Sequence, residues 1–596
     1  MLGGNALTHH PLQFRGSTGL RTPRGVQLQQ KLRGGRRCGK NVGHLFTRRI
    51  GDLSIVAVMP GKEWVLAIDV GTGGTKAALI SSLGSVSASA FALHPAPSNS
   101  AGVAASLEQD QESWWLATKN AVWSCLGSSA AVAKGISVAQ VCCIAVTGQM
   151  QDVILLPQPG VLTRSKAILY SDARAEFEAD EIARLAGGAD NVASITGFFQ
   201  GASSVLAKLR WLDRHEPEAV ENCQALLLGG HDFVVWKLCE RFVTDATTAS
   251  TTGLTTRSFQ YAEDLMKDVE LAHWINRLPE LHPPDYPCGE VSANAAVELG
   301  CAALQGVPVL HVCGDAGACT LGAGAGARGS LYAYLGTSGW VAGSFLRNTC
   351  SKSDFVSNPS GVFTLAHPES SLVFKTGSIL NAGGNLEWAA TNLGSSRGKE
   401  TANWKEFDGL AASAPAGSGG LLYLPYLNGE RCPFEDRNAR ACFLGISATT
   451  SRAHLFRAVM EGVAFAMRSA RDAMSSEQLP EDLSRPLRVV GGGARSPLWP
   501  AVMADVFGQT VEVLEDAQEV GVKGAALLAG KWLGWQSTES PGGSWIQIKS
   551  TFSPSPAEQE TYRELYMAYS ESYCALQQVF RKLSSSREFQ SRTGSA

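Results

Sequence analysis

The chain has 596 residues, of which 44% are hydrophobic and 18% are charged. This size and composition exclude a single small binding module, and they are typical of a Gly-rich α/β protein with two large domains or more rather than of a disordered, collagen-like or coiled-coil chain. The net charge of −3 is unevenly distributed, because the first 50 residues contain ten Lys or Arg and no Asp or Glu, which leaves the remainder near −13. An acidic body argues against nucleic-acid binding, which needs clustered positive charge.

The basic, acid-free N-terminus is typical of an organelle transit peptide. We predict a disordered transit peptide over residues 1–57, and the sequence Ile55-Val56-Ala57 favours a plastid over a mitochondrial address. If this segment is instead only a basic tail, we expect a cytoplasmic protein. No membrane span is predicted, because uncharged stretches long enough to cross a bilayer, such as Gly329 to Leu346, are interrupted by residues such as Gly, Ser and Thr.

The 14 cysteines include no CxxC pair and no metal-ligand spacing. They are most simply small buried hydrophobic residues in a reducing compartment. The adjacent pair Cys142 and Cys143 leaves a redox role open.

From Trp64 onward, strand-like apolar runs alternate with helical patterns, which predicts α/β layers. Residues 64–80 predict a strand, a Gly-rich turn and a second strand, and residues 141–150 predict a buried strand that ends in a loop. The helical patterns cover Glu176–Ala186, Val205–Arg214, His454–Arg471, Leu498–Phe507 and Glu560–Leu583. In the last of these, one apolar stripe recurs at helical spacing, made of Leu565, Tyr569, Tyr573, Leu576 and Phe580.

A short internal sequence repeat suggests two similar halves. Gly71-Thr72-Gly73-Gly74 lies near the start of the body, and Gly336-Thr337-Ser338-Gly339 follows about 265 residues later in a similarly strand-rich setting. In the first turn the glycines let the backbone approach an anion, and Asp69 at the strand end has the chemistry to hold Mg²⁺ through water. The turn is not a Walker loop, and by itself it is equally consistent with an ordinary β-hairpin.

Two further segments carry candidate chemistry. Asp315 follows the apolar run Val307–Val312 and precedes a run of small residues, which places a carboxylate at a strand end and a helix start. Such a carboxylate can accept a proton from a hydroxyl, although a helix N-cap is the plain alternative. Gly491-Gly492-Gly493 follows another predicted strand and would let a flat ring lie against the main chain, although an ordinary loop that binds no ligand explains a glycine triplet as well.

These motifs occur together in an order that resembles the FGGY carbohydrate kinases of the actin-like ATPase superfamily, from Trp64 to about Leu583. The strongest match is Ala441-x-Phe443-x-Gly445-Ile446 followed by the segment 454–461, which fits the C-terminal family signature. Residues 203–215 nearly fit the N-terminal signature and depart from it at Val205.

The resemblance implies two ribonuclease-H-like α/β domains around a central cleft, with an N-terminal sugar-binding domain over 62–310, a nucleotide-binding domain over 311–583 and a polar tail over 584–596. It implies ATP and Mg²⁺ as cofactors, Asp315 as the catalytic base that also binds substrate, and Asp69 as the metal residue acting through water. The other implied sugar-binding residues are Gln149, Met150, Gln151 and Asp232. The implied ATP-binding residues are Gly71, Thr72, Gly73, Lys76, Gly336, Thr337, Gly384, Gly492 and Gly493.

Within the family the chain is most similar to xylulokinases, which implies phosphorylation of the terminal hydroxyl of D-xylulose by a monomer or homodimer. One departure is informative: Gly-Gln-Met-Gln-Asp stands where the xylulokinase pattern has Gly-Gln-Met-His-Gly, so Gln151 replaces a sugar-contacting histidine. D-Ribulose, a deoxy-xylulose and glycerol therefore stay open as substrates, as does a non-catalytic organellar regulator.

Several polar residues have structural alternatives. Asp232 is as consistent with a helix cap as with a sugar ligand, and Lys76 with a surface strand lysine as with a phosphate ligand. We favour a turn-stabilising role for Asp245 and a structural ion pair for Glu430 and Arg431 over a place at the cleft.

Overall fold

The computed structural model describes residues 63–593, except residues 101, 104, 162 and 163 and the ranges 348–360, 395–402, 475–484 and 536–544. All of these residues belong to one unit, Val56–Ala596. The predicted transit peptide, residues 1–57, lies outside the described residues. None of the described helices has both the length and the apolar character that crossing a bilayer requires.

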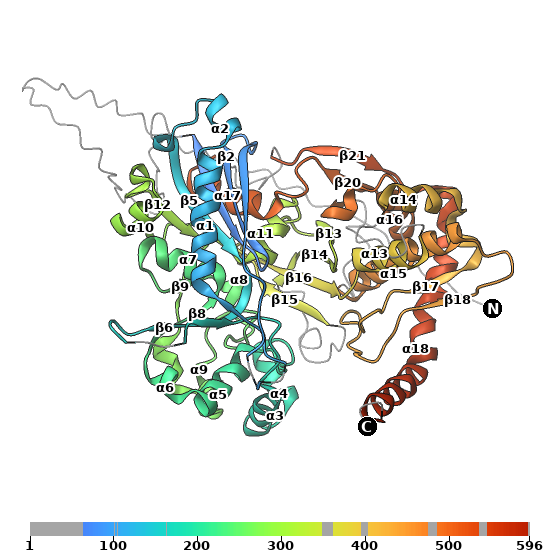
Figure 1. Cartoon of the computed structure of the whole chain (residues 1–596), viewed down its shortest axis with the longest axis horizontal. Coiled ribbons are helices and arrows are strands. Elements are labelled where there is room, and N and C mark those ends of the chain that lie inside the picture. Colours follow the sequence, from blue (N-terminus) through green and yellow to red (C-terminus); the bar gives the residue numbers. More distant parts are fainter. Residues whose placement is uncertain are drawn as a thin grey trace, which may run out of the picture. The chain divides into compact units, whose positions relative to one another are not determined.

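A six-stranded mixed sheet forms the first half (Figure 1). The predicted strand-turn-strand is β1 (Trp64–Val70) and β2 (Gly74–Ser81), which pair antiparallel, and β5 (Val141–Gly148) pairs parallel to β1. The sheet order is β11 (Gly289–Glu290), β12 (Pro308–His311), β5, β1, β2 and β3 (Val86–Leu93).

A seven-stranded sheet repeats this plan. β13 (Leu331–Leu335) pairs antiparallel with β14 (Gly339–Leu346), and parallel with β19 (Leu487–Val490). The predicted pair of α/β domains with related halves is therefore confirmed, and each Gly-Thr turn joins the first two strands of its sheet. The sheet order is β15 (Val362–Ala366), β16 (Leu372–Ile379), β14, β13, β19, β20 (Val511–Leu514) and β21 (Ile548–Phe552).

Both faces of the first sheet are covered by helices, which explains why β1 is a continuous apolar run. Leu66 and Ile68 belong to the core under α1 (Gln111–Leu126) and α7 (Gly230–Cys239), whereas Val65 and Ala67 belong to the core under α17 (Val520–Trp532). Because successive side chains of a strand point to opposite faces of the sheet, the apolar residues of β1 pack against the helices on both faces.

Two helices far apart in the sequence, α11 (Asp315–Gly322) and α17, pack against each other through glycines. A Cβ atom on Gly322 would lie 1.8 Å from the carbonyl oxygen of Val520, and one on Gly524 would lie 1.8 Å from that of Ala318. Since no side chain fits at these points, the small residues after Asp315 serve this close approach. The approach fixes the N-terminal end of α11, where Asp315 stands.

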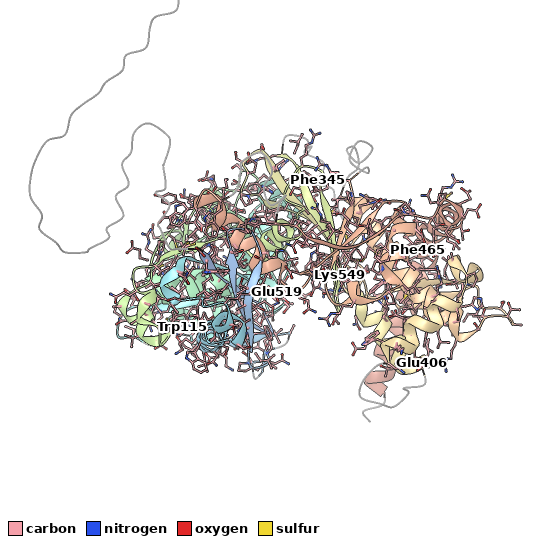
Figure 2. All side chains as sticks on the ribbon, turned by 90° about the horizontal axis from the view of Figure 1, so that it is seen from above. Trp115, Phe345, Glu406, Phe465, Glu519 and Lys549 are labelled. Carbon is pink, nitrogen blue, oxygen red and sulfur yellow. The ribbon has the colours of Figure 1, made fainter. Side chains whose placement is uncertain are left out.

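The second half has a separate core around α15 (Arg452–Ala473), which packs against α16 (Trp499–Phe507) and α18 (Pro556–Thr593). Figure 2 labels Phe465 in this core and Trp115 in the core of the first half. The predicted apolar stripe of α18 is confirmed, because Tyr569, Tyr573 and Phe580 are buried there. The helix continues to Thr593, so residues 584–593 of the predicted polar tail are helical.

A four-stranded sheet in the order β4 (Glu108–Asp110), β7 (Lys166–Ile168), β6 (Met150–Pro157) and β8 (Cys223–Gly229) extends the first half. The loop predicted to bind sugar lies at the start of β6. Two predicted helices in this region are confirmed as α3 (Glu176–Leu185) and α5 (Val205–His215). The remaining described α-helices and strands are α2 (Ser129–Ala133), α4 (Ala189–Thr196), α6 (Pro217–Glu221), β9 (Val243–Thr244), α8 (Ala246–Ala249), α9 (Glu263–Asp268), β10 (Glu280–Leu281), α10 (Ala293–Glu298), α13 (Gly383–Leu393), α14 (Trp404–Ser413), β17 (Leu422–Leu424) and β18 (Cys442–Leu444).

Candidate active site

Two cavities contain most of the predicted site residues. The first, which we term the Asp315 cavity, has a volume of about 430 Å³ and is lined from both halves of the molecule. The second, the Gly492 cavity, has a volume of about 610 Å³ and is lined by residues of the second half, Tyr334 to Trp499. The two cavities thus divide the predicted sugar and nucleotide residues between them.

The Asp315 cavity brings together the predicted sugar loop, the predicted base and parts of both Gly-Thr turns. Its polar lining includes Thr72, Gln149, Gln151, Asp315, Ser338 and Arg431.

Asp315 is the first residue of α11, and its Oδ1 accepts a hydrogen bond of 2.7 Å from the backbone N–H of Ala316. Burial, with a smaller contribution from the neighbouring Asp69 carboxylate, raises the pKa of Asp315 to about 7, while His231 opposes this rise. A carboxylate that titrates near neutral pH is suited to accept a proton from an alcohol.

Asp69 is the next-to-last residue of β1 and is not among the residues that line either cavity. Burial raises its pKa to about 6, against the lowering effect of Lys76 and His231. A Cβ atom on Gly521 of α17 would lie 2.2 Å from Asp69 Oδ2, so this glycine makes room for the carboxylate. The position fits an acid that reaches the cavity through water.

The Gly-Thr turn of the second half forms a wall shared by the two cavities. Gly336 and Thr337 line the Gly492 cavity, whereas Ser338 and Gly339 line the Asp315 cavity. A group bound along this turn therefore has access to both. In the first half, Gly71 N–H donates to Gly74 O at 3.1 Å, and Thr72 lines the Asp315 cavity, while Gly71 and Gly73 line neither.

In the Gly492 cavity, a glycine lies against an aromatic ring. Gly492 and Gly493 line it, and a Cβ atom on Gly493 would lie 2.5 Å from the ring of Trp499. Gly383 also lines it, whereas Gly384 does not; the N–H of Gly384 donates to Thr337 O at 3.0 Å and supports the shared turn from α13.

The sugar loop supplies unpartnered polar atoms. Gln149 is 2% exposed. Its amide acts on the buried Asp152 carboxylate, whose pKa it helps to lower, but neither its amide nitrogen nor its amide oxygen makes a hydrogen bond of ordinary geometry among the described residues. Gln151 has a left-handed φ of 68°, and its Nε2 donates to Thr251 O at 2.6 Å. Met150 fills the space beside Gly314, where a Cβ atom would lie 2.3 Å from the sulfur. A buried amide without a partner is costly unless a ligand or water satisfies it.

Two predicted ligands are placed elsewhere. Asp232 is fully buried and lines neither cavity; its carboxylate accepts hydrogen bonds from Leu228 N–H at 2.8 Å and His311 Nε2 at 2.7 Å. Lys76 lines neither cavity either, because its Nζ pairs with Glu519 at 3.3 Å and donates to Gln518 O at 2.5 Å. Figure 2 labels Glu519, which lies beside the blue strands of the first sheet.

A buried polar cluster behind the sugar loop went unrecognised in the sequence. The ring nitrogens of His231 face two oxygens, with Nδ1 3.2 Å from Gln149 O and Nε2 3.3 Å from Asp245 Oδ2. Burial opposes a charge on this ring, but Asp232 and Asp245 outweigh it and raise the pKa of His231. Metal-ligating atoms of His231, Asp245 and His311 lie within 4.8 Å of one another, yet each histidine already bonds to a carboxylate, so the cluster is explained as a hydrogen-bond network.

The residues around Glu430 also differ from expectation. The predicted ion pair between Glu430 and Arg431 is absent, since Glu430 Oε1 instead accepts the backbone N–H groups of Arg431 at 2.8 Å and Leu380 at 3.0 Å. Arg431 itself lines the Asp315 cavity. Asp245, which we expected to stabilise a turn, is instead the N-cap of α8 and accepts the N–H of Thr248 at 3.1 Å.

Comparison with known proteins identifies the family of the chain. The models for the N-terminal and C-terminal domains of the FGGY family of carbohydrate kinases match residues 64–322 and 331–532. A xylulose kinase of Staphylococcus epidermidis is 29% identical over 87% of this chain and 98% of its own, and an erythritol kinase of Brucella abortus is 29% identical over 74% and 84%. The crystal structure of a xylulose kinase from Rhodospirillum rubrum superposes with a TM-score of 0.74 and 28% identity over 87% of this chain and 100% of its own. The predicted resemblance is confirmed, and the chain belongs to the FGGY family of carbohydrate kinases.

Proposed function

We propose that this carbohydrate kinase transfers the γ-phosphoryl group of ATP to the terminal hydroxyl of a free pentulose, with D-xylulose as the first candidate. The observation that carries the proposal is the Asp315 cavity, where a base with a pKa near 7 and the unpartnered amide of Gln149 share one space. A small polyhydroxylated substrate would satisfy the amide and present a hydroxyl to the carboxylate.

In the proposed reaction, Asp315 takes the proton of the terminal hydroxyl as the hydroxyl oxygen attacks the γ-phosphorus. The new O–P bond forms while the bond between the γ-phosphorus and its bridging oxygen breaks, and ADP leaves. The adenosine would occupy the Gly492 cavity, and the phosphates would follow Gly336 and Thr337 toward Ser338. Positioning and neutralisation of charge, rather than covalent chemistry by the protein, dominate such transfers.

The residues around Asp69 fit Mg²⁺. The oxygen donors that line the Asp315 cavity include the Asp315 carboxylate and the hydroxyls of Thr72 and Ser338, and the Asp69 carboxylate is close enough to raise the pKa of Asp315. This hard cation prefers oxygen ligands and keeps several waters. Asp69, which does not line the cavity, would hold the ion through water. When bound, Mg²⁺ would neutralise phosphate charge.

Gln151 supports D-ribulose as a second candidate. Its left-handed backbone and its bond to Thr251 O fix a neutral amide where the xylulokinase pattern has histidine. Epimers that differ at one hydroxyl are distinguished by one or two hydrogen bonds, so this change bears directly on the choice between pentuloses.

The test is an ATP-consumption screen of the chain from Val58 onward against D-xylulose, D-ribulose, a deoxy-xylulose, glycerol and hexuloses. We expect the highest kcat/KM with a pentulose and product phosphorylated at its terminal oxygen. Turnover with none of these compounds, in a protein that binds ATP, would contradict the proposal and favour a regulatory role.

A further inference from the structure

Arg431 contributes the only guanidinium or ammonium group among the described residues that line the Asp315 cavity. Its side chain is exposed, and within the described chain no carboxylate lies within ion-pair distance of it. An arginine of the first half is differently placed: Arg174 pairs with Asp172 and Glu108, both at 2.7 Å. The neighbouring Glu430 carboxylate acts on Arg431 only beyond ion-pair distance. Arg431 is therefore a cation without an ion-pair partner in the described chain, and it lines the same cavity as the predicted base.

The backbone of Arg431 has close contacts on two sides, whereas the residue is exposed. Glu430 is 2% exposed, and its carboxylate joins the N–H of Arg431 to that of Leu380, which follows β16 and also lines the cavity. A Cβ atom on Gly361 would lie 2.0 Å from Arg431 O, so the main chain is also closely packed on that side. A fixed backbone with an unpaired guanidinium is suited to receive an anion rather than to stabilise the fold.

Lys76, the basic residue predicted to bind phosphate, already has an ion-pair partner in the protein. Lys76 is paired with Glu519, so it is not free to neutralise a phosphate. The transferred phosphoryl group spreads negative charge over its oxygens, and it would pass from the Gly336–Thr337 side of the shared turn to the Asp315 side. The planar fork of arginine matches two phosphate oxygens at once, which the point charge of lysine does not.

We propose that Arg431 binds the γ-phosphoryl group of the nucleotide and stays on it during its transfer to the sugar. This inference rests on the proposed function for its nucleotide but not for the identity of the sugar. Arg431 then acts as a catalytic residue, and Glu430 acts through it as a positioning residue.

The experiment compares Arg431→Gln with Arg437→Gln, an exposed arginine in the same loop that lines neither cavity. Binding of Mg²⁺–AMP-PNP and of Mg²⁺–ADP is measured by titration calorimetry. For R431Q we expect the dissociation constant of AMP-PNP to rise about tenfold or more, the value for ADP to stay within about twofold, and kcat to fall about 10²–10³-fold. R437Q should match the wild type in all three.

A second variant distinguishes loss of the guanidinium from misfolding of the protein. Arg431→Lys keeps the charge, so AMP-PNP affinity should fall by no more than about threefold, while kcat falls at least about tenfold because the fork is lost. Equal weakening of both nucleotides, or unchanged AMP-PNP affinity in R431Q, would overturn the inference. If the wild type phosphorylates no pentulose while the difference between AMP-PNP and ADP persists, the substrate proposal fails and the role of Arg431 stands.

Discussion

The two cavities differ in what lines them. The Asp315 cavity is lined from both halves and contains a titrating carboxylate, an unpartnered amide and a free guanidinium. The Gly492 cavity is lined by the second half, with glycines and the aromatic rings of Tyr334, Trp404 and Trp499. Under the proposed function, chemistry and sugar selection are assigned to the first cavity, and the second is assigned to the adenosine of the nucleotide. Substitutions confined to one cavity should affect one of these properties and spare the other.

The largest effect is expected from Asp315→Asn. The amide keeps the shape of the side chain but cannot accept the hydroxyl proton, so kcat should fall about 10²–10⁴-fold. ADP affinity, a property of the other cavity, should stay within about twofold. Full turnover in D315N would refute the assignment of the base, and loss of ADP binding would show that the two cavities are not separable.

A substitution in the second cavity should give the reciprocal result. The added methyl of Gly493→Ala would lie 2.5 Å from the Trp499 ring and 2.7 Å from the Leu335 side chain, so the cavity floor must shift. We expect KM for ATP to rise about tenfold while KM for the sugar changes little. Gly409→Ala on α14 is the matched control, because its new methyl would meet no atom within 4 Å. A similar rise in the KM values for ATP and for the sugar in G493A would contradict the assignment of the two ligands to separate cavities.

The smallest effect is expected from Gln151→His, within the sugar loop. Restoring the imidazole should shift relative kcat/KM toward D-xylulose over D-ribulose by about fivefold, the value of one hydrogen bond. Gln158→His, at an exposed position directly after β6, is the control. Unchanged relative kcat/KM in Q151H would remove this residue from the account of specificity.

Residues next to strand ends could be predicted from the sequence. Asp315, the 149–151 loop and both Gly-Thr turns each follow a short apolar run, and such positions meet at one edge of a sheet whatever the rest of the chain does. The presence of two related halves could also be predicted, because the turns Gly71–Gly74 and Gly336–Gly339 have nearly the same sequence.

The burial of individual polar side chains and their hydrogen-bond partners could not be predicted from the sequence. Asp232 has the letters of a strand-to-helix junction, but its partner His311 lies 79 residues away and holds the carboxylate in the interior. Glu430 and Arg431 are adjacent in sequence, which suggested an ion pair, yet a backbone N–H of Leu380, 50 residues away, helps to turn the carboxylate from the guanidinium. The Gln151-Asp152 departure from the xylulokinase pattern was the visible signal that this region differs, and His231 left none.

The most direct test of the central claim is the pH dependence of kcat/KM for the preferred sugar. Because burial raises the pKa of Asp315 and the base must be ionised, activity should be lost as the pH falls through about 7 and should be complete above it. His231→Gln, which removes a group that lowers this pKa, should move the midpoint upward, provided that melting temperature and ADP binding remain normal. A profile that stays flat from pH 5 to pH 9 at unchanged stability would contradict proton transfer to Asp315.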